Sequence, residues 1–392
     1  MSLSFHPPQR TLLGPGPSDV NPRILEALSR PTIGHLDPVF IEMMDDLKKL
    51  LQFAFQTRNE LTFPVSAPGS AGMETAFVNL VERGDKVIIC QNGVFGGRMR
   101  ENAERCGAQV VMVQDDWGKA IDLSKVEKAL NQNTDAKILA FVHAETSTGV
   151  RSDAEGLCAL AKKFDCLSIV DAVTSLGGIE VNVDDWGIDA IYSGTQKCLS
   201  CVPGISPVSF SEKAAHNIKS RKSPVQSWFL DMSLVMGYWS TQSKRSYHHT
   251  APVNSLYALH ESLLILQEEG LFNSWSRHKL HHEALVVGLE ALGLSFVVQP
   301  EDRLPQLNLV RFPEGINENA ARQFLLENYN LEIGSGLGPL AGNVWRIGLM
   351  GFGSNKKNVL LCLSAIGSAL RAQGGQLDLP AALQSAEDVY QN

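Results

Sequence analysis

The sequence predicts an α/β fold in which a large domain with a mostly parallel sheet precedes a smaller α+β domain. The chain has 392 residues, more than a single hydrophobic core usually serves, so two domains are expected. In the first half, short apolar runs rich in β-branched residues alternate with longer amphipathic stretches. This alternation is typical of a parallel sheet covered by helices on both faces. After about residue 255 the pattern changes to long helical stretches followed by strand-like runs.

In the large domain, an expected helix follows most of the expected strands. The pairs Gly84-Asp85 and Cys106-Gly107 supply stop signals between them. The apolar runs expected to form strands are residues 61–65, 86–90, 109–113, 137–143 and 166–172. The stretches expected to form helices are residues 70–82, 95–106, 123–131 and 153–164.

The smaller domain is expected to combine long helices with a short sheet. Its helical stretches are 256–269, 275–292 and 318–328, and its strand-like runs are 295–299, 307–312 and 344–350. The Pro/Gly-rich segment 12–22 cannot form regular structure, so it is expected to be an arm packed across a domain or a partner subunit. The expected organisation is an N-terminal arm (1–20), a large domain (21–255), a small domain (256–372) and a peripheral tail (373–392).

Composition excludes several classes of function. The 34 basic and 42 acidic residues give a net charge of −8, and neither sign forms a long run, so nucleic-acid binding is not expected. The seven cysteines are odd in number and lie mostly in apolar segments, as buried reduced thiols do. The N-terminus lacks the features of a secretory signal, and no uncharged apolar run reaches the roughly 18 residues needed to cross a bilayer. We therefore expect a cytoplasmic protein that is not bound to a membrane.

Lys197 is the first candidate for chemistry. A short apolar strand runs into Ser-Gly-Thr-Gln, and this one lysine follows among small and apolar residues. Burial lowers the pKa of an amine and favours its nucleophilic form, which is how lysines become Schiff-base carriers. The alternative is a surface lysine whose stem lies along apolar surface.

Asp171 supports the chemical interpretation of Lys197. It closes an expected strand and precedes the lysine by about one strand-crossover-strand unit, and His143 ends another strand. Ligands of such sheets bind beyond the carboxyl ends of the strands. A carboxylate keeps a pyridine nitrogen protonated, so the pair indicates pyridoxal 5′-phosphate. The alternative for Asp171 is a helix or turn cap.

Further residues could complete such a site. A phosphate needs the free amides of a helix N-terminus, and Gly69, Ser70 and Ala71 lie in a small-residue turn that opens a helix. Phe95 could stack on the ring, and the hydroxyl of Thr146 could bond the ring oxygen. Each also has an ordinary interpretation: a strand–turn–helix connection, a core phenylalanine and a Ser/Thr turn.

Arg346 lies between apolar residues in an expected strand of the second domain. A charged side chain is costly there unless it is paired. A substrate carboxylate would match the guanidinium in a bidentate way, and a structural salt bridge is the alternative.

The sequence resembles the class V aminotransferases, and within them the alanine/serine:glyoxylate aminotransferase group. The resemblance covers nearly the whole chain and implies a pyridoxal-phosphate-dependent transferase of fold type I, which is the aspartate aminotransferase-like fold. Its most specific motifs surround Asp171 and Lys197. The motifs that carry it are residues 12–18, 34–38, 55–57, 145–149, 170–178, 192–197, 247–250 and 336–338.

The resemblance also implies roles for individual residues. Lys197 would carry the cofactor, with Asp171 at the pyridine nitrogen, Thr146 at the phenolic oxygen, Phe95 stacked on the ring, and Gly69, Ser70 and Gln196 at the phosphate. Tyr247 and Thr250 would reach the phosphate of a neighbouring subunit, so the active enzyme would be a homodimer with shared sites. Arg346 would take the substrate carboxylate, with Gly34 and His35 near the mouth of the site.

Two positions depart from the pattern of several relatives. The stacking residue is Phe95 instead of a tryptophan, and the phosphate loop reads Pro68-Gly69-Ser70 instead of Ser-Gly-His. Both departures concern cofactor affinity more than the type of reaction.

The expected reaction is transamination between alanine or serine and glyoxylate, giving a 2-oxo acid and glycine. Ureidoglycine–glyoxylate or serine–pyruvate transamination are alternatives within the family. A lyase such as a cysteine desulfurase would need a nucleophilic cysteine on a mobile loop, and we interpret Cys198 and Cys201 as core residues. A binding module without turnover would lack a catalytic group. No metal site is expected, because the histidines of 277–282 are predicted to face solvent.

Overall fold

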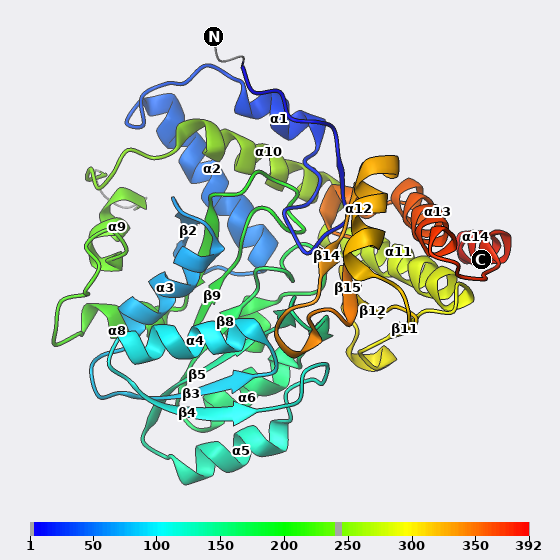
Figure 1. The fold of residues 1–392 in the computed structure, drawn as a ribbon. Helices are drawn as coiled ribbons and strands as arrows, with labels where there is room; N and C mark the ends of the chain where they lie inside the picture. Colours follow the sequence, from blue (N-terminus) through cyan, green and yellow to red (C-terminus); the bar gives the residue numbers. More distant parts are fainter. Residues whose placement is uncertain (1–3, 240–244, 392) are drawn as a thin grey trace.

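The large domain is built on a mostly parallel sheet. The computed structural model describes residues 4–239 and 245–391. Within them, a seven-stranded sheet has the order β2-β10-β9-β8-β5-β3-β4, and only β10 runs antiparallel to its neighbours (Figure 1). The strands are β2 (Leu61–Val65), β3 (Lys86–Gln91), β4 (Gln109–Gln114), β5 (Ala136–Val142), β8 (Leu167–Asp171), β9 (Ala190–Tyr192) and β10 (Ser206–Phe210).

The five strands expected in this sheet are confirmed, whereas β10 was not predicted. Its sequence contains Pro207, which pairs with Pro64 of the edge strand β2. Proline lacks the amide hydrogen of a regular ladder and so weakens the strand pattern. The carbonyl of Pro207 still accepts a hydrogen bond from the amide of Ser193, so β10 belongs to the ladder.

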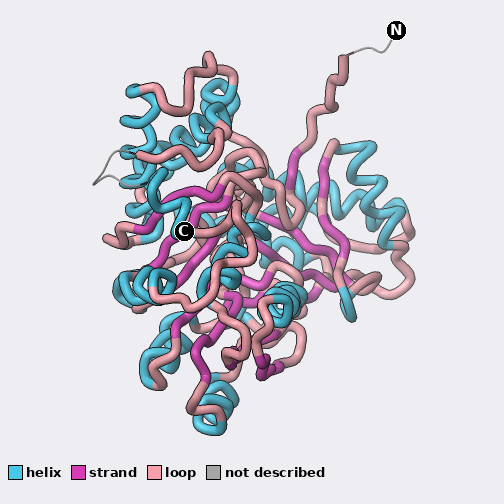
Figure 2. The backbone as a smooth tube through the Cα atoms, turned by 90° about the vertical axis from the view of Figure 1, so that its left-hand side faces the viewer, coloured by secondary structure: helices cyan, strands magenta, loops and turns pink. Residues whose placement is uncertain are grey.

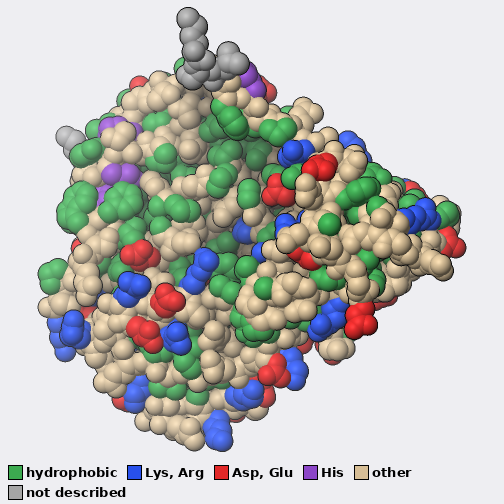
Figure 3. Space-filling view, viewed as in Figure 1, with side chains coloured by type: hydrophobic (Ala, Val, Ile, Leu, Met, Phe, Trp, Pro, Cys, Tyr) green, Lys and Arg blue, Asp and Glu red, His purple; other side chains and the backbone are tan. Residues whose placement is uncertain are grey.

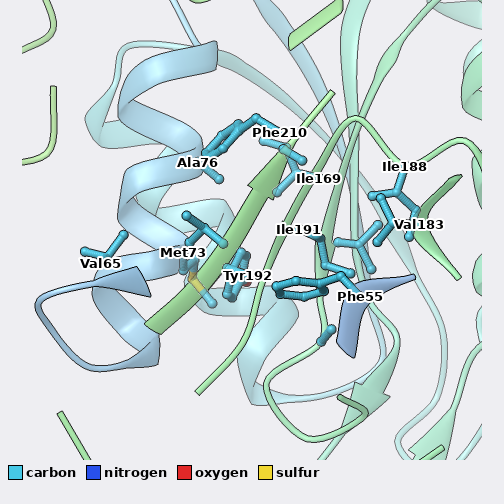
Figure 4. Packing of buried hydrophobic residues seen from close by; sticks show 14 of the residues in the cluster. Phe55, Val65, Met73, Ala76, Ile169, Val183, Ile188, Ile191, Tyr192 and Phe210 are labelled. Carbon is cyan, nitrogen blue, oxygen red and sulfur yellow. The ribbon is translucent and has the colours of Figure 1, made fainter. Parts of the chain in front are cut away.

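Helices cover the sheet and bury its side chains. Figure 4 shows Met73 and Ala76 of α3 packed near Tyr192 and Phe210 of the sheet, and Figure 2 shows helices on either side of the strands. The helices of this part are α1 (Pro22–Leu28), α2 (Pro38–Phe55), α3 (Gly69–Leu80), α4 (Val94–Arg105), α5 (Leu123–Gln132), α6 (Ala154–Lys163), α7 (Val183–Trp186), α8 (Glu212–Lys219), α9 (Met232–Trp239) and α10 (Val253–Glu269). A short hairpin joins β6 (Ala144–Glu145) to β7 (Val150–Arg151).

The second part of the chain forms its own core around a sheet of order β11-β12-β15-β14. The expected strand at 295–299 is shorter in the structure and spans two residues. The strands are β11 (Ser295–Phe296), β12 (Leu307–Arg311), β14 (Gly334–Ser335) and β15 (Val344–Gly348). The helices are α11 (Leu271–Ala291), α12 (Glu318–Tyr329), α13 (Lys356–Ala372) and α14 (Leu379–Val389), with 3-10 turns η1 (Pro300–Asp302), η2 (Gly338–Leu340) and η3 (Gly351–Gly353).

The segment after residue 373 is not peripheral, contrary to our expectation. It contains α14, which packs against α11 and α13. Ala382 and Ala386 are fully buried in the core of this part. Their small side chains allow α14 to approach its neighbours closely. The sequence of this short segment does not indicate which elements it packs against.

The N-terminal arm packs across its own chain. Its strand β1 (Thr11–Leu12) pairs in parallel with β13 (Leu331–Glu332). The amide of Gly348 donates to the carbonyl of Leu13 at 2.7 Å, so the arm lies beside β15 and leads from there toward Lys197.

The prediction that the histidines of α11 face solvent is wrong. His278 is fully buried, with Nδ1 on the Ser274 carbonyl at 2.7 Å and Nε2 accepting from the Gly351 amide at 2.9 Å. His281 contacts the Tyr390 hydroxyl, and His282 contacts Asn308. The neighbouring polar residues suggested a solvent-exposed helix, so the sequence did not show that this face of α11 packs inside the domain.

Six of the seven cysteines are buried, and all seven are free thiols. No helix among the described residues has the length and apolar character needed to cross a membrane. The expected cytoplasmic location stays a prediction.

Candidate active site

Three neighbouring strands of the large sheet end in register. Val142 of β5 pairs with Asp171 of β8, which in turn pairs with Tyr192 of β9. The loops that follow these strand ends, together with the start of α3, enclose a cavity of about 180 Å³. The predicted site residues that line it are Gly69, Ser70, Phe95, Thr146, Asp171, Gln196 and Lys197. A larger surface groove of about 900 Å³ beside β2 and α8 contains none of the predicted site residues.

Lys197 lies at one end of the cavity and is partly buried. Its Nζ donates a hydrogen bond to the carbonyl of Pro15 in the N-terminal arm. Burial lowers the pKa of the amine to about 8, and the nearby charge of Arg346 acts in the same direction. A larger fraction of the amine is therefore neutral and nucleophilic at physiological pH than in an exposed lysine.

The N-terminal arm covers this lysine closely. A Cβ atom at Gly16 would lie 2.4 Å from the Nζ of Lys197, and Gly16 has a φ of +105°, so only glycine fits. The hydroxyl of Ser18 donates to the Lys197 carbonyl at 2.7 Å. The arm therefore helps to position the Lys197 side chain at the cavity.

Asp171 is held rigidly at the strand end. Only 3% of its surface is exposed, Oδ1 accepts from the Val173 amide at 2.8 Å, and Oδ2 accepts from the Tyr192 hydroxyl at 2.9 Å. Burial raises the pKa of Asp171 to about 7, and the two hydrogen bonds oppose that rise. A carboxylate this costly to bury is best satisfied by a cationic partner in the cavity.

The start of α3 offers amides for an anion. Its N-cap Pro68 provides no side-chain cap, and Gly69 and Ser70 line the cavity. Ala71 is not among the residues that line the cavity, and its amide donates to the Pro68 carbonyl at 2.7 Å. Its role in the cradle stays a prediction. The buried Oε1 of Gln196 has no hydrogen-bond partner among the described residues.

Phe95 and Thr146 also line the cavity. Phe95 is in the first turn of α4, with the guanidinium of Arg98 4.8 Å from its ring centroid. Thr146 is buried and follows the hairpin strand β6. Both positions suit the stacking and hydroxyl roles expected for them.

Arg346 of β15 reaches toward this lining from the second domain. Its Nε donates to the Ser335 carbonyl at 2.7 Å, and its Nη1 donates to the Thr146 carbonyl at 3.4 Å. No carboxylate in the described part of the chain forms an ion pair with Arg346, which is only 9% exposed. Burial lowers the pKa of this guanidinium to about 10. The structural salt bridge considered as an alternative is therefore not found there.

Four predicted residues lie away from the cavity in the same chain. His35 and Tyr247 contact each other, with ring centroids 5.4 Å apart, and Tyr247 is 62% exposed. Gly34 and Thr250 are also exposed. A single chain does not bring these residues to Lys197.

Comparison with known proteins identifies the family. The sequence matches the family described as Aminotransferase class-V over residues 27–343, which is most of the chain. The chain belongs to the class V aminotransferases. The family expected from the motifs is thus confirmed, and with it an aminotransferase that depends on pyridoxal 5′-phosphate.

Relatives of two kinds resemble this aminotransferase over nearly its full length. An alanine–glyoxylate aminotransferase of Rattus norvegicus is 42% identical, covering 93% of this chain and 88% of its own. The (S)-ureidoglycine–glyoxylate transaminase of Bacillus subtilis is 37% identical, covering 98% and 96%. The crystal structure of the Bacillus subtilis ureidoglycine–glyoxylate aminotransferase has a TM-score of 0.97 at 38% identity over 100% of both chains. That of the Nostoc sp. alanine–glyoxylate aminotransferase has a TM-score of 0.92 at 45% identity over 95% and 98%.

The residues present fit the cofactor of this aminotransferase. The unpartnered Oε1 of Gln196 and the start of α3 offer polar groups to the cavity, and the buried carboxylate of Asp171 also lines it. Lys197 supplies the amine at the same cavity. Gly69, Ser70 and Gln196 would therefore hold the phosphate, and Asp171 would hold the pyridine nitrogen.

The cysteines of this aminotransferase do not suit a lyase. Cys198, Cys201 and Cys362 are buried, and burial raises the pKa of each thiol to about 12. A cysteine desulfurase of Thermococcus onnurineus has a TM-score of 0.71 at 16% identity, which shows a shared fold alone.

Sequence reasoning missed residues that support the site. Pro15 and Tyr192 bond Lys197 and Asp171 directly, and Glu145 accepts the amide of Phe95. Tyr192 and Glu145 both lie in motifs that were noted, but a motif does not show where a side chain points. His143, noted at a strand end, instead packs edge-on against Trp186 with ring centroids 5.6 Å apart.

Proposed function

We propose that this enzyme transaminates between a small amino acid, alanine or serine, and glyoxylate, giving a 2-oxo acid and glycine. The observation that carries the proposal is Arg346, a buried guanidinium without an ion-pair partner among the described residues, on the same side as Lys197 and Thr146. A carboxylate of an amino or 2-oxo acid would satisfy it. The alanine–glyoxylate relatives, which are 40–42% identical to this chain in several mammals, support the choice of substrates.

The residues of the chain divide the work. Arg346 orients the substrate through its carboxylate, and Asp171 keeps a positive charge at the pyridine nitrogen. When bound, pyridoxal 5′-phosphate supplies the electron sink that spreads negative charge from the substrate Cα. When the Lys197 amine is not bonded to the cofactor, it would take the proton from the substrate Cα and so act as general base.

Ureidoglycine is the second candidate donor. The Bacillus subtilis enzyme covers 98% of this chain in sequence and 100% in structure, whereas the alanine–glyoxylate aminotransferases of Rattus norvegicus and Mus musculus cover 93% and 95% in sequence. The same Arg346 would serve its carboxylate. Serine–pyruvate exchange remains the other alternative within the family.

We also propose a homodimer with shared sites. Gly34, His35, Tyr247 and Thr250 lie apart from their own cavity, so a second copy would have to carry them to it. Figure 3 shows hydrophobic and histidine side chains gathered over the side of the molecule where α9 lies. The exposed apolar side chains of that region include Trp228, Phe229, Leu234 and Tyr247. Such a surface is typical of a protein–protein interface.

A screen of amino donors tests the substrate proposal. Serine and ureidoglycine would each be assayed with glyoxylate and with pyruvate, and alanine with glyoxylate, following the cofactor absorbance and product formation. We expect the highest kcat/KM for alanine or serine with glyoxylate. A higher value for ureidoglycine would select the second candidate, and sulfide release from cysteine without need of a 2-oxo acid would overturn transamination.

A further inference from the structure

Glu145 is a buried carboxylate directly behind the active-site cavity. It is 0% exposed, while its neighbours Ala144 and Thr146 both line the cavity. Its Oε1 accepts from the amide and the hydroxyl of Ser147 at 3.0 and 2.6 Å, and its Oε2 accepts from the amide of Phe95 at 3.1 Å. A fully buried acid in a cavity wall needs a reason beyond packing.

One consequence of these contacts is a cap on α4. The residue preceding the helix is Gly93, which has no side chain to cap it. The Ser147 hydroxyl accepts from the Val94 amide at 2.9 Å, and Glu145 accepts from the Phe95 amide, so two free helix amides are satisfied from the neighbouring loop. A Cβ at Gly93 would lie 2.4 Å from the Glu145 Cδ, so glycine is what lets the carboxylate approach.

The hydrogen bonds fix Glu145 as an acceptor on both oxygens. The Ser147 hydroxyl accepts from the Val94 amide and donates to Oε1 of Glu145, which also accepts from the Ser147 amide. Burial raises the pKa of Glu145, while the bonds from Ser147 and Phe95 lower it. A glutamine amide at position 145 would turn its NH2 group toward a donor, either the Phe95 amide or the Ser147 amide and hydroxyl.

The same loop reaches two groups of the site. Phe95 lies at the cavity in the turn that Glu145 caps, and Arg346 donates to the carbonyl of Thr146, the next residue. The negative charge of Glu145 also acts on Arg346, in the sense that favours its protonated form. No other acidic residue connects both groups within the described ranges 4–239 and 245–391.

We infer that Glu145 is a positioning residue, which holds the first turn of α4 so that Phe95 covers the cofactor ring. The inference rests on the proposed function for its catalytic meaning, but its physical content concerns cofactor binding. Glu145 itself touches neither cofactor nor substrate. It acts through Phe95, and its removal should therefore weaken cofactor binding before it affects the fold.

The test compares Glu145→Gln with Glu101→Gln, which changes an exposed carboxylate on the same helix. The dissociation constant of pyridoxal 5′-phosphate would be measured on cofactor-free protein by quenching of tryptophan fluorescence. We expect E145Q to bind about tenfold more weakly, as for loss of a helix cap, and E101Q to bind like the wild type. The induced circular dichroism of the bound cofactor should also decrease in E145Q, since the ring is held less firmly.

A double-mutant cycle separates positioning from general destabilisation. If Glu145 acts through Phe95, then E145Q should weaken binding by less than about twofold in a Phe95→Ala background. A residue that only stabilised the domain would show the same loss in both backgrounds. Full additivity of the two losses would therefore overturn the inference.

Two further outcomes are decisive. Cofactor binding of E145Q within twofold of the wild type would also overturn the inference. If E145Q does not fold, Ser147→Ala takes its place, with an expected loss of about threefold, because it removes one of the three bonds. If the wild-type enzyme binds cofactor but transaminates no tested donor, the proposed function fails, whereas the inference about Glu145 is still decided by the binding data.

Discussion

The surroundings of Lys197 and the loop around Tyr247 differ in how complete they are within one chain. Lys197, Asp171 and Arg346 come from separate parts of the sequence, yet one chain brings them to a common site. Tyr247 is instead exposed and contacts His35. The chemical centre is thus a property of the fold, whereas Tyr247 and Thr250, implied for the phosphate, would reach a site only in the proposed homodimer.

The difference has a physical origin. Asp171 and Tyr192 are fixed by strand register, because backbone pairing leaves no freedom in where the strand ends meet. Tyr247 lies before α10 among residues 245–252, none of which belongs to a strand in the described part of the chain. A site built on strand ends is preformed, and a surface loop gains its position from what packs against it.

Breaking the chemical centre should have the largest effect. Lys197→Ala removes the amine that carries the cofactor and moves the Cα proton, so kcat should fall by about 1,000-fold or more. Single-turnover absorbance changes with alanine would measure it. Lys279→Ala, which changes an exposed lysine of α11, is the control and should retain activity. Near-normal turnover by K197A would contradict the role of the lysine.

Asp171→Asn should have the next largest effect. Asparagine keeps the shape of the side chain but cannot hold the pyridine nitrogen protonated, so kcat should fall on the order of 100-fold. Steady-state assays at saturating cofactor would measure the loss. Asp116→Asn changes an exposed aspartate and should leave kcat unchanged. If D171N kept its kcat and lost only cofactor affinity, Asp171 would be a binding group alone.

Mixing two inactive or weakened proteins sharpens the comparison. Tyr247→Phe/Thr250→Ala should bind cofactor roughly tenfold more weakly, because hydrogen bonds to a charged phosphate are lost. If these residues serve the partner's site, dimers that combine this variant with K197A contain one intact site. Activity at limiting cofactor should therefore rise on mixing.

The matched mixture of K197A with D171N should stay inactive, because both residues belong to the same cavity. Rescue in this control would mean that subunits exchange more than the Tyr247 loop. No rescue in the first mixture would contradict the shared site and leave the lysine assignment untouched.

The pH dependence of cofactor capture is the smallest expected effect. Capture needs the neutral amine, and burial lowers the pKa of Lys197 to about 8. The capture rate of cofactor-free enzyme should therefore rise as pH increases toward about 8 and level off above it. Arg346→Met should move the midpoint upward, since the charge of Arg346 contributes to the lowering. A midpoint near that of an exposed lysine would show that the amine is solvated.

Much of the fold could be predicted because buried parallel strands have continuous apolar runs, as in β3 and β5. Strand β10 was missed because Pro207 interrupts the residue pattern typical of a strand. Helix α14 was missed because the sequence of a short segment does not show what it packs against. The burial of His278 was missed for the same reason. Sequence period shows which face is apolar, but polar residues satisfied inside a core leave no such pattern.

The candidate site shows a similar division. Lys197 and Asp171 could be found because their types and spacing match a chemical need, and the structure places them at one cavity. The sequence could not show that the Ala71 amide donates to the Pro68 carbonyl, because only the geometry of the first turn of α3 reveals that bond. Pro15 reaches Lys197 through a backbone carbonyl, which any residue has, so no sequence signal could have found it.

The central claim is that Lys197 carries the cofactor. The most direct test is reduction of the cofactor-bound enzyme with borohydride, followed by proteolysis and mass spectrometry of the labelled peptide. We predict that the reduced cofactor is attached to the peptide containing Lys197, and that K197A yields no stable adduct. Attachment to any other lysine, or an undiminished adduct in K197A, would contradict the account.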